Sequence, residues 1–460
     1  MLCSNAARQG LPTRLFSTST DVYDVLIVGG GVVGSGLAHL LKGLKVGLLE
    51  RGPHPPLKTF GEIPHPRCYA LSPYSLQLLG TSIVSFLNPA YYDSMQVWEQ
   101  DSPSLVVFDS KDLLGTSFEN VSYLGAVVED APLVAALWEN IQDSVDCFTD
   151  TQVRSLKMDE HVVHVTTTKD TNLSARLLVA ADGANSWVRQ ECGIGWEGFD
   201  YNRTALTCTV RLTKPMPCRR RAFQRFLPNG PLALLPTRSP QYATVVWSTT
   251  PEQAMEYKDD SSDFVEKINS ILQQGPQRIP PLFPPMDGGI LGNFFYGMER
   301  VVDTVQYGPT MAHWNDHDEI FSAPPKVEQI AGPRFTFPLT CRHASSYVHN
   351  NRIALVGDAA HTVHPMAGQG LNLGLQDVGA LAERVKRAHG TGMDVTTFLQ
   401  EYSTTQRMQN SIRINGMHAL HEIFGNHSTI MQHGKSLGMH AVNHMGPLRR
   451  QLAAVAAGAT

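Results

Sequence analysis

The 460-residue sequence lacks a strong excess of either charge and lacks closely spaced cysteines. Charged residues make up 17% of the chain and the formal net charge is -5, so the sequence predicts no basic face for a nucleic-acid backbone. The seven cysteines are odd in number and never spaced as C-x-x-C, which argues against a disulfide framework or a zinc knuckle and favours a reducing compartment. With 42% hydrophobic residues, we expect a globular chain of roughly two or three structural units.

A long uninterrupted apolar run is also missing. The stretch 24–41 comes nearest, but it begins with Asp24 and contains five glycines, so we predict no transmembrane span there. The last segment, 438–460, predicts a short amphipathic helix with Arg449 and Arg450 on its polar side. Such a helix either touches a membrane surface or packs against the protein.

Acidic residues are absent from the first twenty positions, which instead carry Arg8, Arg14 and several serines and threonines. A basic, acid-free leader is typical of a mitochondrial transit peptide. We therefore expect residues 1–20 to direct the chain to the mitochondrial matrix, with cleavage after Phe16. The alternative is a frayed terminus without a targeting role.

The first motif that is present lies between positions 22 and 50 and predicts a βαβ unit: a buried strand over 22–28, a helix over about 32–42 and a second strand that ends at Glu50. In the G-x-G-x-x-G pattern, Gly29 allows a tight turn, Gly31 lets a pyrophosphate approach the backbone, and Gly34 lets the helix pack on the strand. The helix N-terminus favours an anion, and Glu50 can accept hydrogen bonds from an adenosine ribose. The motif suits NAD and FAD equally.

A second candidate site lies in "IALVGDAAHTVHPMAGQGLNLGLQD", residues 353–377. Asp358, His361 and His364 are spaced three apart and could face one metal ion. The four glycines at 357, 368, 370 and 374 argue for close approach of a backbone to a ligand, and no further carboxylate or thiolate stands nearby to complete a metal shell. We therefore predict a nucleotide site without metal.

Two stretches, 177–189 and 353–358, resemble motifs of the FAD-dependent aromatic hydroxylases. In "LLVAADGANSWVR" (177–189) a strand ends in Asp182-Gly183, and the strand 353–356 runs into Gly357-Asp358, in the order found in that group. The resemblance implies FAD as cofactor, with Asp358 holding the ribityl hydroxyls and the segment from Gly368 to Asn372 bringing backbone N–H groups to the flavin. The residues expected to bind the cofactor are Gly29, Gly31, Gly34, Glu50, Arg51, Arg67, Asp182, Asp358, Pro365, Gly368, Gly370, Leu371 and Asn372.

Within that group, "MQVWE" (95–99), "RFLPNGPLALLP" (225–236), "VVWST" (245–249) and "GDAAHTVHPMAGQG" (357–370) look like the ubiquinone-biosynthesis monooxygenases, in particular their mitochondrial branch. The resemblance implies hydroxylation, at C5, of a polyprenyl-4-hydroxybenzoate-type ring by a flavin C4a-hydroperoxide formed with O₂. It also implies a ferredoxin and ferredoxin reductase as electron donors, other ubiquinone-biosynthesis proteins in a complex, and peripheral contact with the matrix side of the inner membrane. Direct reduction by NADPH stays open.

No side chain in the sequence identifies itself as the catalytic base. Arg67 and Arg225 are candidates for contact with the flavin or a phenolate, with a structural salt bridge as the alternative for each. Two other functions also fit part of the pattern: a flavin-binding subunit that holds a biosynthetic complex together, and a flavin hydroxylase of another aromatic ring.

The predicted fold is α/β, with a Rossmann-like FAD-binding domain, an inserted antiparallel β substrate domain and C-terminal helices. We place the FAD-binding domain at 21–195 and 352–395, the mostly β substrate domain at 196–351, and a helical segment at 396–460. The runs 205–212, 222–236 and 242–249 predict the antiparallel sheet over the flavin. In the helical segment we expect six apolar residues to pack inside: Phe398, Tyr402, Met408, Ile412, Met417 and Leu420.

Overall fold

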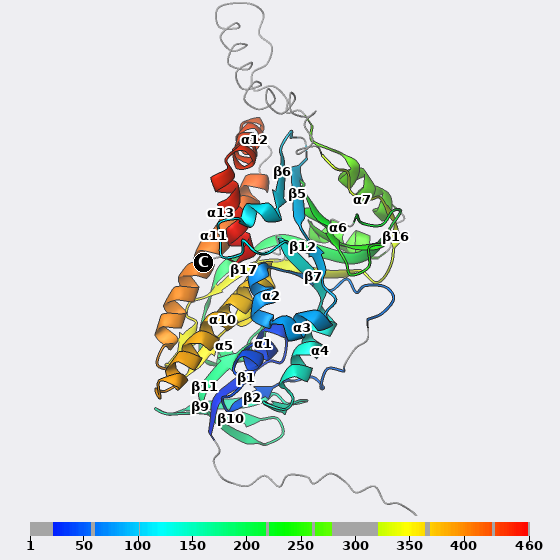
Figure 1. The fold of residues 1–460 in the computed structure, drawn as a ribbon. Coiled ribbons are helices and arrows are strands. Elements are labelled where there is room, and N and C mark those ends of the chain that lie inside the picture. The colour runs from blue at the N-terminus through cyan, green and yellow to red at the C-terminus, as the bar shows by residue number, and fades with distance from the viewer. Residues whose placement is uncertain are drawn as a thin grey trace, which may run out of the picture.

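The computed structural model describes residues 22–56, 60–100, 102–217, 220–259, 263–277, 321–363, 369–425 and 428–458. Within them, two large β-sheets and one small sheet are covered by helices. The first large sheet lies in the lower half of Figure 1 and the second in the upper half. This arrangement, with helices at the C-terminal end, confirms the predicted α/β fold.

The first sheet contains the βαβ unit. Its strands run in the order β18-β19-β11-β1-β2-β8, with β10 on β11 and β9 on β10, and the pairs from β19 to β8 are parallel. The central strand is fully buried at Val25, Leu26 and Ile27, as expected for a strand covered on both faces. The strands are β1 (Val22–Val28), β2 (Val46–Leu49), β8 (Asp146–Phe148), β9 (Val153–Met158), β10 (Val163–Thr167), β11 (Asn172–Ala180), β18 (Val348–His349) and β19 (Ile353–Leu355).

The second sheet has nine strands in the order β20-β17-β12-β15-β14-β13-β5-β6, with β16 beside β12. All its pairs are antiparallel except β13 with β5. Its strands are β5 (Ser94–Glu99), β6 (Leu105–Asp109), β12 (Trp196–Leu212), β13 (Arg221–Phe226), β14 (Leu232–Pro236), β15 (Tyr242–Thr249), β16 (Val327–Ile330), β17 (Phe335–Ala344) and β20 (His361–Thr362). Strands β5 and β6 lie inside the range predicted for the FAD-binding domain, yet they pair with this sheet.

A small antiparallel sheet, β3 (Cys68–Leu71), β7 (Gly125–Glu129) and β4 (Ala90–Tyr92), makes the third layer. The helices are α1 (Val32–Leu40), α2 (Pro73–Leu79), α3 (Thr81–Phe86), α4 (Asp130–Ile141), α5 (Trp187–Glu191), α6 (Pro251–Lys258), α7 (Phe264–Gln273), α10 (Gln369–Gly390), α11 (Leu399–Gly425), α12 (Thr429–His444) and α13 (Gly446–Ala457). Short 3₁₀ turns are η1 (Ser110–Leu113) and η2 (Gly357–Ala359). In the described part of the chain, no helix is long and apolar enough to cross a membrane.

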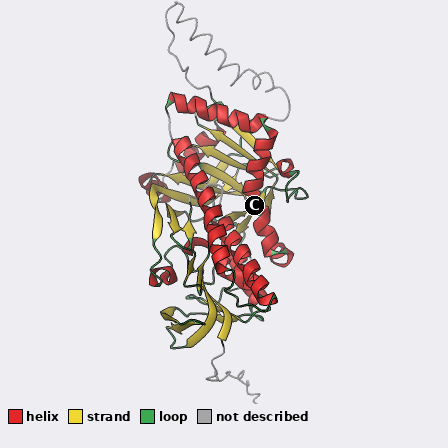
Figure 2. Ribbon diagram, turned by 90° about the vertical axis from the view of Figure 1, so that its left-hand side faces the viewer, coloured by secondary structure: helices red, strands yellow, loops and turns green. Residues whose placement is uncertain are grey.

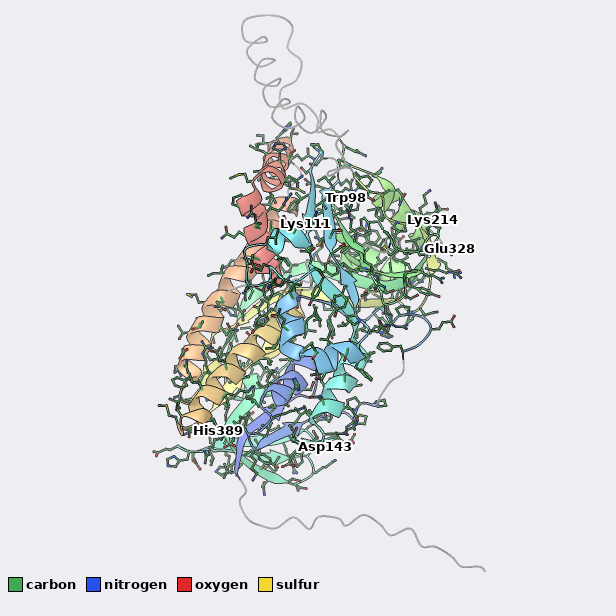
Figure 3. The ribbon with its side chains drawn as sticks, in the orientation of Figure 1. Trp98, Lys111, Asp143, Lys214, Glu328 and His389 are labelled. Carbon is green, nitrogen blue, oxygen red and sulfur yellow. The ribbon has the colours of Figure 1, made fainter. Side chains whose placement is uncertain are left out.

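The nine-stranded sheet has one dry face and one partly open face. On the dry face, Trp98 is fully buried among side chains of β12, β14, β15 and α7, and its indole N–H donates to the carbonyl of Gln274 at 3.0 Å (Figure 3). Helix α7 covers this face through residues such as Phe264 and Ile268. Because side chains alternate along a strand, the opposite face is free to line a site.

Helices α11, α12 and α13 lie on one face of the molecule, turned towards the viewer in Figure 2. Tyr402 on α11 is fully buried, as predicted, but Met408, Ile412 and Leu420 are 59%, 67% and 47% exposed. The prediction that these three pack inside is therefore wrong. Only one stripe of α11 meets α10 and the sheets, and the three side chains lie outside that stripe.

Candidate functional site

The first glycine turn joins β1 to α1 at the carboxyl edge of the first sheet. Gly29 has φ +107°, a conformation that favours glycine, and a Cβ on it would lie 2.3 Å from the carbonyl oxygen of Ala181. A Cβ on Gly34 would lie 1.8 Å from the carbonyl oxygen of Gly29, so α1 can pack here only with glycine. A Cβ on Gly31 would meet nothing within 4 Å among the described residues, so the backbone at the start of α1 is open to a ligand.

Glu50 follows β2 beside this turn. Its Oε2 accepts the N–H of Gly30 at 2.6 Å and its Oε1 accepts the N–H of Gly52 at 2.8 Å. The indole N–H of Trp138 donates to the carbonyl of Gly30 at 2.8 Å. These bonds fix the carboxylate, and each oxygen keeps a second lone pair that suits a ribose hydroxyl. Arg51, the next residue, is exposed.

Asp182 follows β11, which ends at Ala180, and begins the second motif. Its Oδ2 accepts the N–H groups of Trp187 at 2.8 Å and Val188 at 3.2 Å. Its Oδ1 is buried without a hydrogen-bond partner among the described residues. Leaving a buried carboxylate oxygen without a donor costs free energy, so this atom fits a ligand that supplies a hydroxyl. Arg189 on α5 is 2% exposed and donates to the carbonyl of Ala359 at 3.2 Å, which connects the second motif to the third.

The third motif is the turn after β19. Gly357 has φ +58°, and its N–H donates to Oδ2 of Asp377 at 2.9 Å. Asp358 follows and reaches solvent, yet the surrounding protein raises the pKa of its carboxyl through burial. The charge of Asp377 also raises this pKa, whereas His361 lowers it. A carboxyl that is both accessible and surrounded by protein suits contact with a bound ligand.

Arg67, Tyr69 and Asp130 form a cluster beside the third motif. The Tyr69 hydroxyl donates to Oδ1 of Asp130 at 2.8 Å, and Nε of Arg67 lies 3.4 Å from Oδ2 of the same carboxylate. Burial raises the pKa of Tyr69, with the charge of Asp130 and, more weakly, that of Asp358 adding to the shift. Arg67 is 70% exposed, so its guanidinium can reach a ligand at this position.

The start of α10 is fixed by Asn372, which is 1% exposed. Its Oδ1 accepts the N–H of Ser72 at 2.9 Å and the hydroxyl of Ser75 at 2.7 Å, and its Nδ2 donates to the carbonyl of Ala70 at 2.9 Å. The side chain thus holds α10 on the β3–α2 connection, which leaves the predicted cofactor role to the backbone. Leu371 packs against the apolar cluster that includes Leu76 and Leu79 of α2. A Cβ on Gly370 would lie 3.6 Å from a methyl group of Val363. The other predicted residues of this segment, His364, Pro365 and Gly368, lie outside the described residues.

His361 does not stand free for a metal. Its Nε2 lies 2.6 Å from Oδ2 of Asp377, and the two side chains are 1% and 0% exposed. The expectation that no further carboxylate stands near this histidine is therefore wrong, but the carboxylate is already paired with it. In the residues that the structure describes, no group of three His, Cys, Asp or Glu side chains is arranged to hold a metal ion.

Sequence reasoning missed the buried polar network behind this pair. Oδ1 of Asp377 accepts Nδ2 of Asn410 at 2.9 Å, the same amide donates to the Tyr347 hydroxyl at 3.1 Å, and that hydroxyl lies 2.7 Å from Nε2 of His343. The chain thereby connects the third motif to α11 and to β17 of the nine-stranded sheet. No periodic pattern marks these residues, because the contacts of Asn410 with Asp377 and Tyr347 join distant segments.

Arg225 does not reach the site. It lies on the dry face of β13 and is 1% exposed. Its guanidinium donates to the carbonyl of Ile271 and, at 3.3 Å, to Oε1 of Gln274 at the end of α7. The predicted contact with flavin or phenolate is therefore replaced by a structural role: the buried charge holds the end of α7.

The open face of the nine-stranded sheet lies over the segment that leads to Arg67. The hydroxyls of Thr207 and Thr209 donate to the carbonyls of Pro66 at 3.2 Å and Pro64 at 2.8 Å, just before Arg67. Five apolar side chains on this face are only partly buried, namely Met95, Val97, Ala233, Leu235 and Val246, whereas their neighbours along each strand are buried. Phe337 on the same face is 41% exposed.

Two features test the fit of FAD to these residues: the open backbone at Gly31 and the orphaned Oδ1 of Asp182. The first suits a pyrophosphate at a helix N-terminus and the second suits a hydroxyl donor. The residues present therefore fit a dinucleotide that spans the turn after β1 and the turn after β19.

Comparisons with known proteins agree with this geometry. Residues 131–277 and 317–409, more than half of the chain, match the FAD binding domain family. The chain is 31% identical to the human ubiquinone biosynthesis monooxygenase COQ6, mitochondrial, over 96% of this chain and 94% of that protein. It is 32% identical to the Xenopus tropicalis protein of the same name, over 96% of this chain and 95% of that protein.

Solved structures show the same fold at lower identity. The p-nitrophenol 4-monooxygenase PnpA from Pseudomonas putida superposes with a TM-score of 0.68 at 18% identity, covering 95% of this chain and 98% of that chain. PqsL, a probable FAD-dependent monooxygenase from Pseudomonas aeruginosa, gives a TM-score of 0.64 at 20% identity, covering 91% of this chain and 100% of that chain.

Proposed function

The chain belongs to the COQ6 ubiquinone biosynthesis monooxygenases, and from that membership we propose that it hydroxylates a polyprenyl-4-hydroxybenzoate-type ring at C5. Its cofactor is FAD, which supplies the activated oxygen atom when it is reduced and exposed to O₂. The observation that carries the substrate class is the partly open apolar face of the nine-stranded sheet, whose strand β17 pairs with β20 directly after the third motif. A phenol with a long apolar tail suits such a wall.

The residues of this chain have three tasks in the proposed reaction. The turn at Gly31 and the carboxylates of Glu50, Asp182 and Asp358 bind the cofactor. The β-sheet face orients the ring and excludes water from the reacting atoms. Arg67 stabilises negative charge on the pyrophosphate or on the phenolate, because its exposed guanidinium lies beside the third motif.

We propose that the electrons come from a ferredoxin and its reductase, and that the chain works in a complex with other ubiquinone-biosynthesis proteins in mitochondria. Peripheral contact with the matrix side of the inner membrane is supported by α12. Its exposed side carries Ile430 and Leu437, at 76% and 49% exposure, whereas Lys435 and His433 are turned inward and buried. No Asp or Glu occurs after Glu422, so nothing acidic opposes an anionic lipid surface.

Product analysis tests the substrate class. The purified FAD-loaded protein with a reducing system should add one hydroxyl to a prenylated 4-hydroxybenzoate, and cells without the gene should accumulate a prenylated precursor that lacks one ring hydroxyl. Val246→Arg on the open face should abolish turnover while FAD stays bound. Met255→Arg, at a 48% exposed position on α6, is the matched control and should be active. Normal ubiquinone in the deleted cells would refute the proposal.

A further inference from the structure

The His361–Asp377 pair lies directly behind the third motif and has no assigned role. The two side chains are 2.6 Å apart and completely enclosed. Burying an ion pair in this way costs desolvation free energy that the attraction only partly returns, so stability alone is a weak reason to keep it. A role in geometry is the better explanation.

Asp377 bonds to three separate segments at once. Its Oδ2 accepts the N–H of Gly357 at 2.9 Å and contacts His361 of β20, and its Oδ1 accepts Asn410 at 2.9 Å and Gln406 at 3.4 Å from α11. The turn after β19, the strand that leads into the 364–368 segment, and the long C-terminal helix therefore share one carboxylate.

The turn itself is enclosed from the other side by α1. A Cβ on Gly357 would lie 3.1 Å from the methyl groups of Val33, which follows the first glycine turn. Gly357 is thus fixed between Val33 and Asp377, and the direction of the next side chain, Asp358, is set by that fixed turn.

We propose that His361 and Asp377 are positioning residues for FAD: together they hold the turn that aims Asp358 at the flavin, and they couple cofactor binding to the docking of α11. This role requires FAD but does not depend on which phenol is hydroxylated.

The charges around His361 give the pair a pH dependence. Burial lowers the pKa of His361, but the charge and hydrogen bond of Asp377 outweigh it, Asp358 acts in the same direction, and the net shift is upward. Arg413 of α11 opposes protonation, and His343, which faces His361 from β17, is held neutral by burial. As pH rises through the raised pKa, His361 loses its proton, the pair weakens, and FAD should be bound less tightly.

The test is the dissociation constant of FAD, measured by flavin fluorescence from about pH 6 to 9, around the ordinary pKa of histidine. Asp377→Asn keeps the shape of the side chain and should raise the constant roughly tenfold or more at neutral pH, because it removes hydrogen bonds to a charged acceptor. His361→Gln keeps a donor for Asp377 but takes up no proton, so it should bind FAD with a constant that no longer varies over this pH range.

Glu99→Gln is the matched control, because Glu99 forms another enclosed ion pair, with Lys435 between β5 and α12. It should lower the melting temperature and leave the FAD constant and its pH profile as in the wild type. An unchanged constant in Asp377→Asn, or an equal change in Glu99→Gln, would overturn the proposal. If Asp377→Asn does not fold, a pH-independent FAD constant in the wild type overturns it instead.

Discussion

At the scale of single residues, Asp358 is the side chain whose loss should affect the cofactor most directly. Asp358→Ala removes a carboxylate that can accept hydrogen bonds from flavin hydroxyls, each worth about 1.5–3 kcal/mol when one partner is charged. Purified Asp358→Ala should therefore lose its yellow colour on dilution, and titration with FAD should show weaker binding. The exposed Asp143, at the lower end of the molecule in Figure 3, offers the control Asp143→Ala, which should keep its flavin.

His343 predicts how stability depends on acid. Burial lowers its pKa to about 4, with the charges of His361 and Arg407 acting in the same direction. The unfolded chain takes up a proton near pH 6.5 that the folded chain refuses, so the free energy of unfolding should fall as the pH drops from about 6.5 towards 4. Urea denaturation at several pH values measures this slope. His343→Phe should reduce it, and an unchanged slope would contradict the assignment.

The glycine turn after β1 and the pairs Asp182-Gly183 and Gly357-Asp358 could be recognised from the sequence, because each belongs to a pattern of neighbouring residues. Asp377 could not be predicted in the same way. It lies at the end of the very stretch that contains the third motif, but its contacts with Gly357 and His361 form only when α10 packs against the turn after β19 and against β20, and its contact with Asn410 forms only when α11 packs on α10. Local spacing carries no information about such contacts.

At the scale of elements, the two kinds of helical glycine should respond oppositely to alanine. Gly34→Ala would place a Cβ 1.8 Å from the carbonyl oxygen of Gly29, so α1 must move away from β1 and the protein should be destabilised and lose FAD. Gly416→Ala on α11 meets nothing within 4 Å among the described residues and should stabilise the fold by about 0.4–1 kcal/mol. Thermal unfolding with and without FAD measures both changes. Equal effects of the two substitutions would contradict this account.

The bounds of β1 agree with the sequence prediction, and α1 ends two residues earlier than expected, at Leu40. Strand and helix were predictable there because the apolar run and the glycines specify both ends. The exposure of Met408, Ile412 and Leu420 was not predictable, because apolar spacing shows which side chains share a face but not whether the protein covers that face.

At the scale of the whole molecule, the leader predicts where the protein acts. Residues 1–20, which lie outside the described residues, should direct a fused fluorescent reporter to mitochondria, and the mature chain should begin near Ser17. Microscopy and N-terminal sequencing of the imported protein measure these outcomes. A fusion in which Arg8 and Arg14 are both replaced by Glu is the control and should stay in the cytosol, as an acidic leader is not imported. Cytosolic retention of the unaltered fusion would refute the assignment.

The exposed apolar side of the C-terminal helices determines the last expected property, binding to a lipid surface. Ile430 and Leu437 lie on a different face of α12 from the buried Lys435. The side of α12 that is turned to solvent therefore presents these apolar groups, and the lysine charge is turned inward. Burying each of these two side chains in a membrane interface contributes about 1.5–3 kcal/mol. The FAD-loaded protein should therefore sediment with vesicles that contain anionic lipid.

Ile430→Asp combined with Leu437→Asp should abolish that sedimentation and leave the flavin bound, because neither side chain reaches the motifs. Met255→Asp combined with Met393→Asp changes two side chains of comparable exposure, 48% and 49%, away from α12 and should leave sedimentation unchanged. If the first double substitution instead converts a dimer to a monomer without any change in vesicle binding, the face joins two copies of the chain, and the lipid assignment is wrong. Measuring the mass of both variants in solution separates these outcomes, since a lipid-binding face leaves the mass of the protein in solution unaltered.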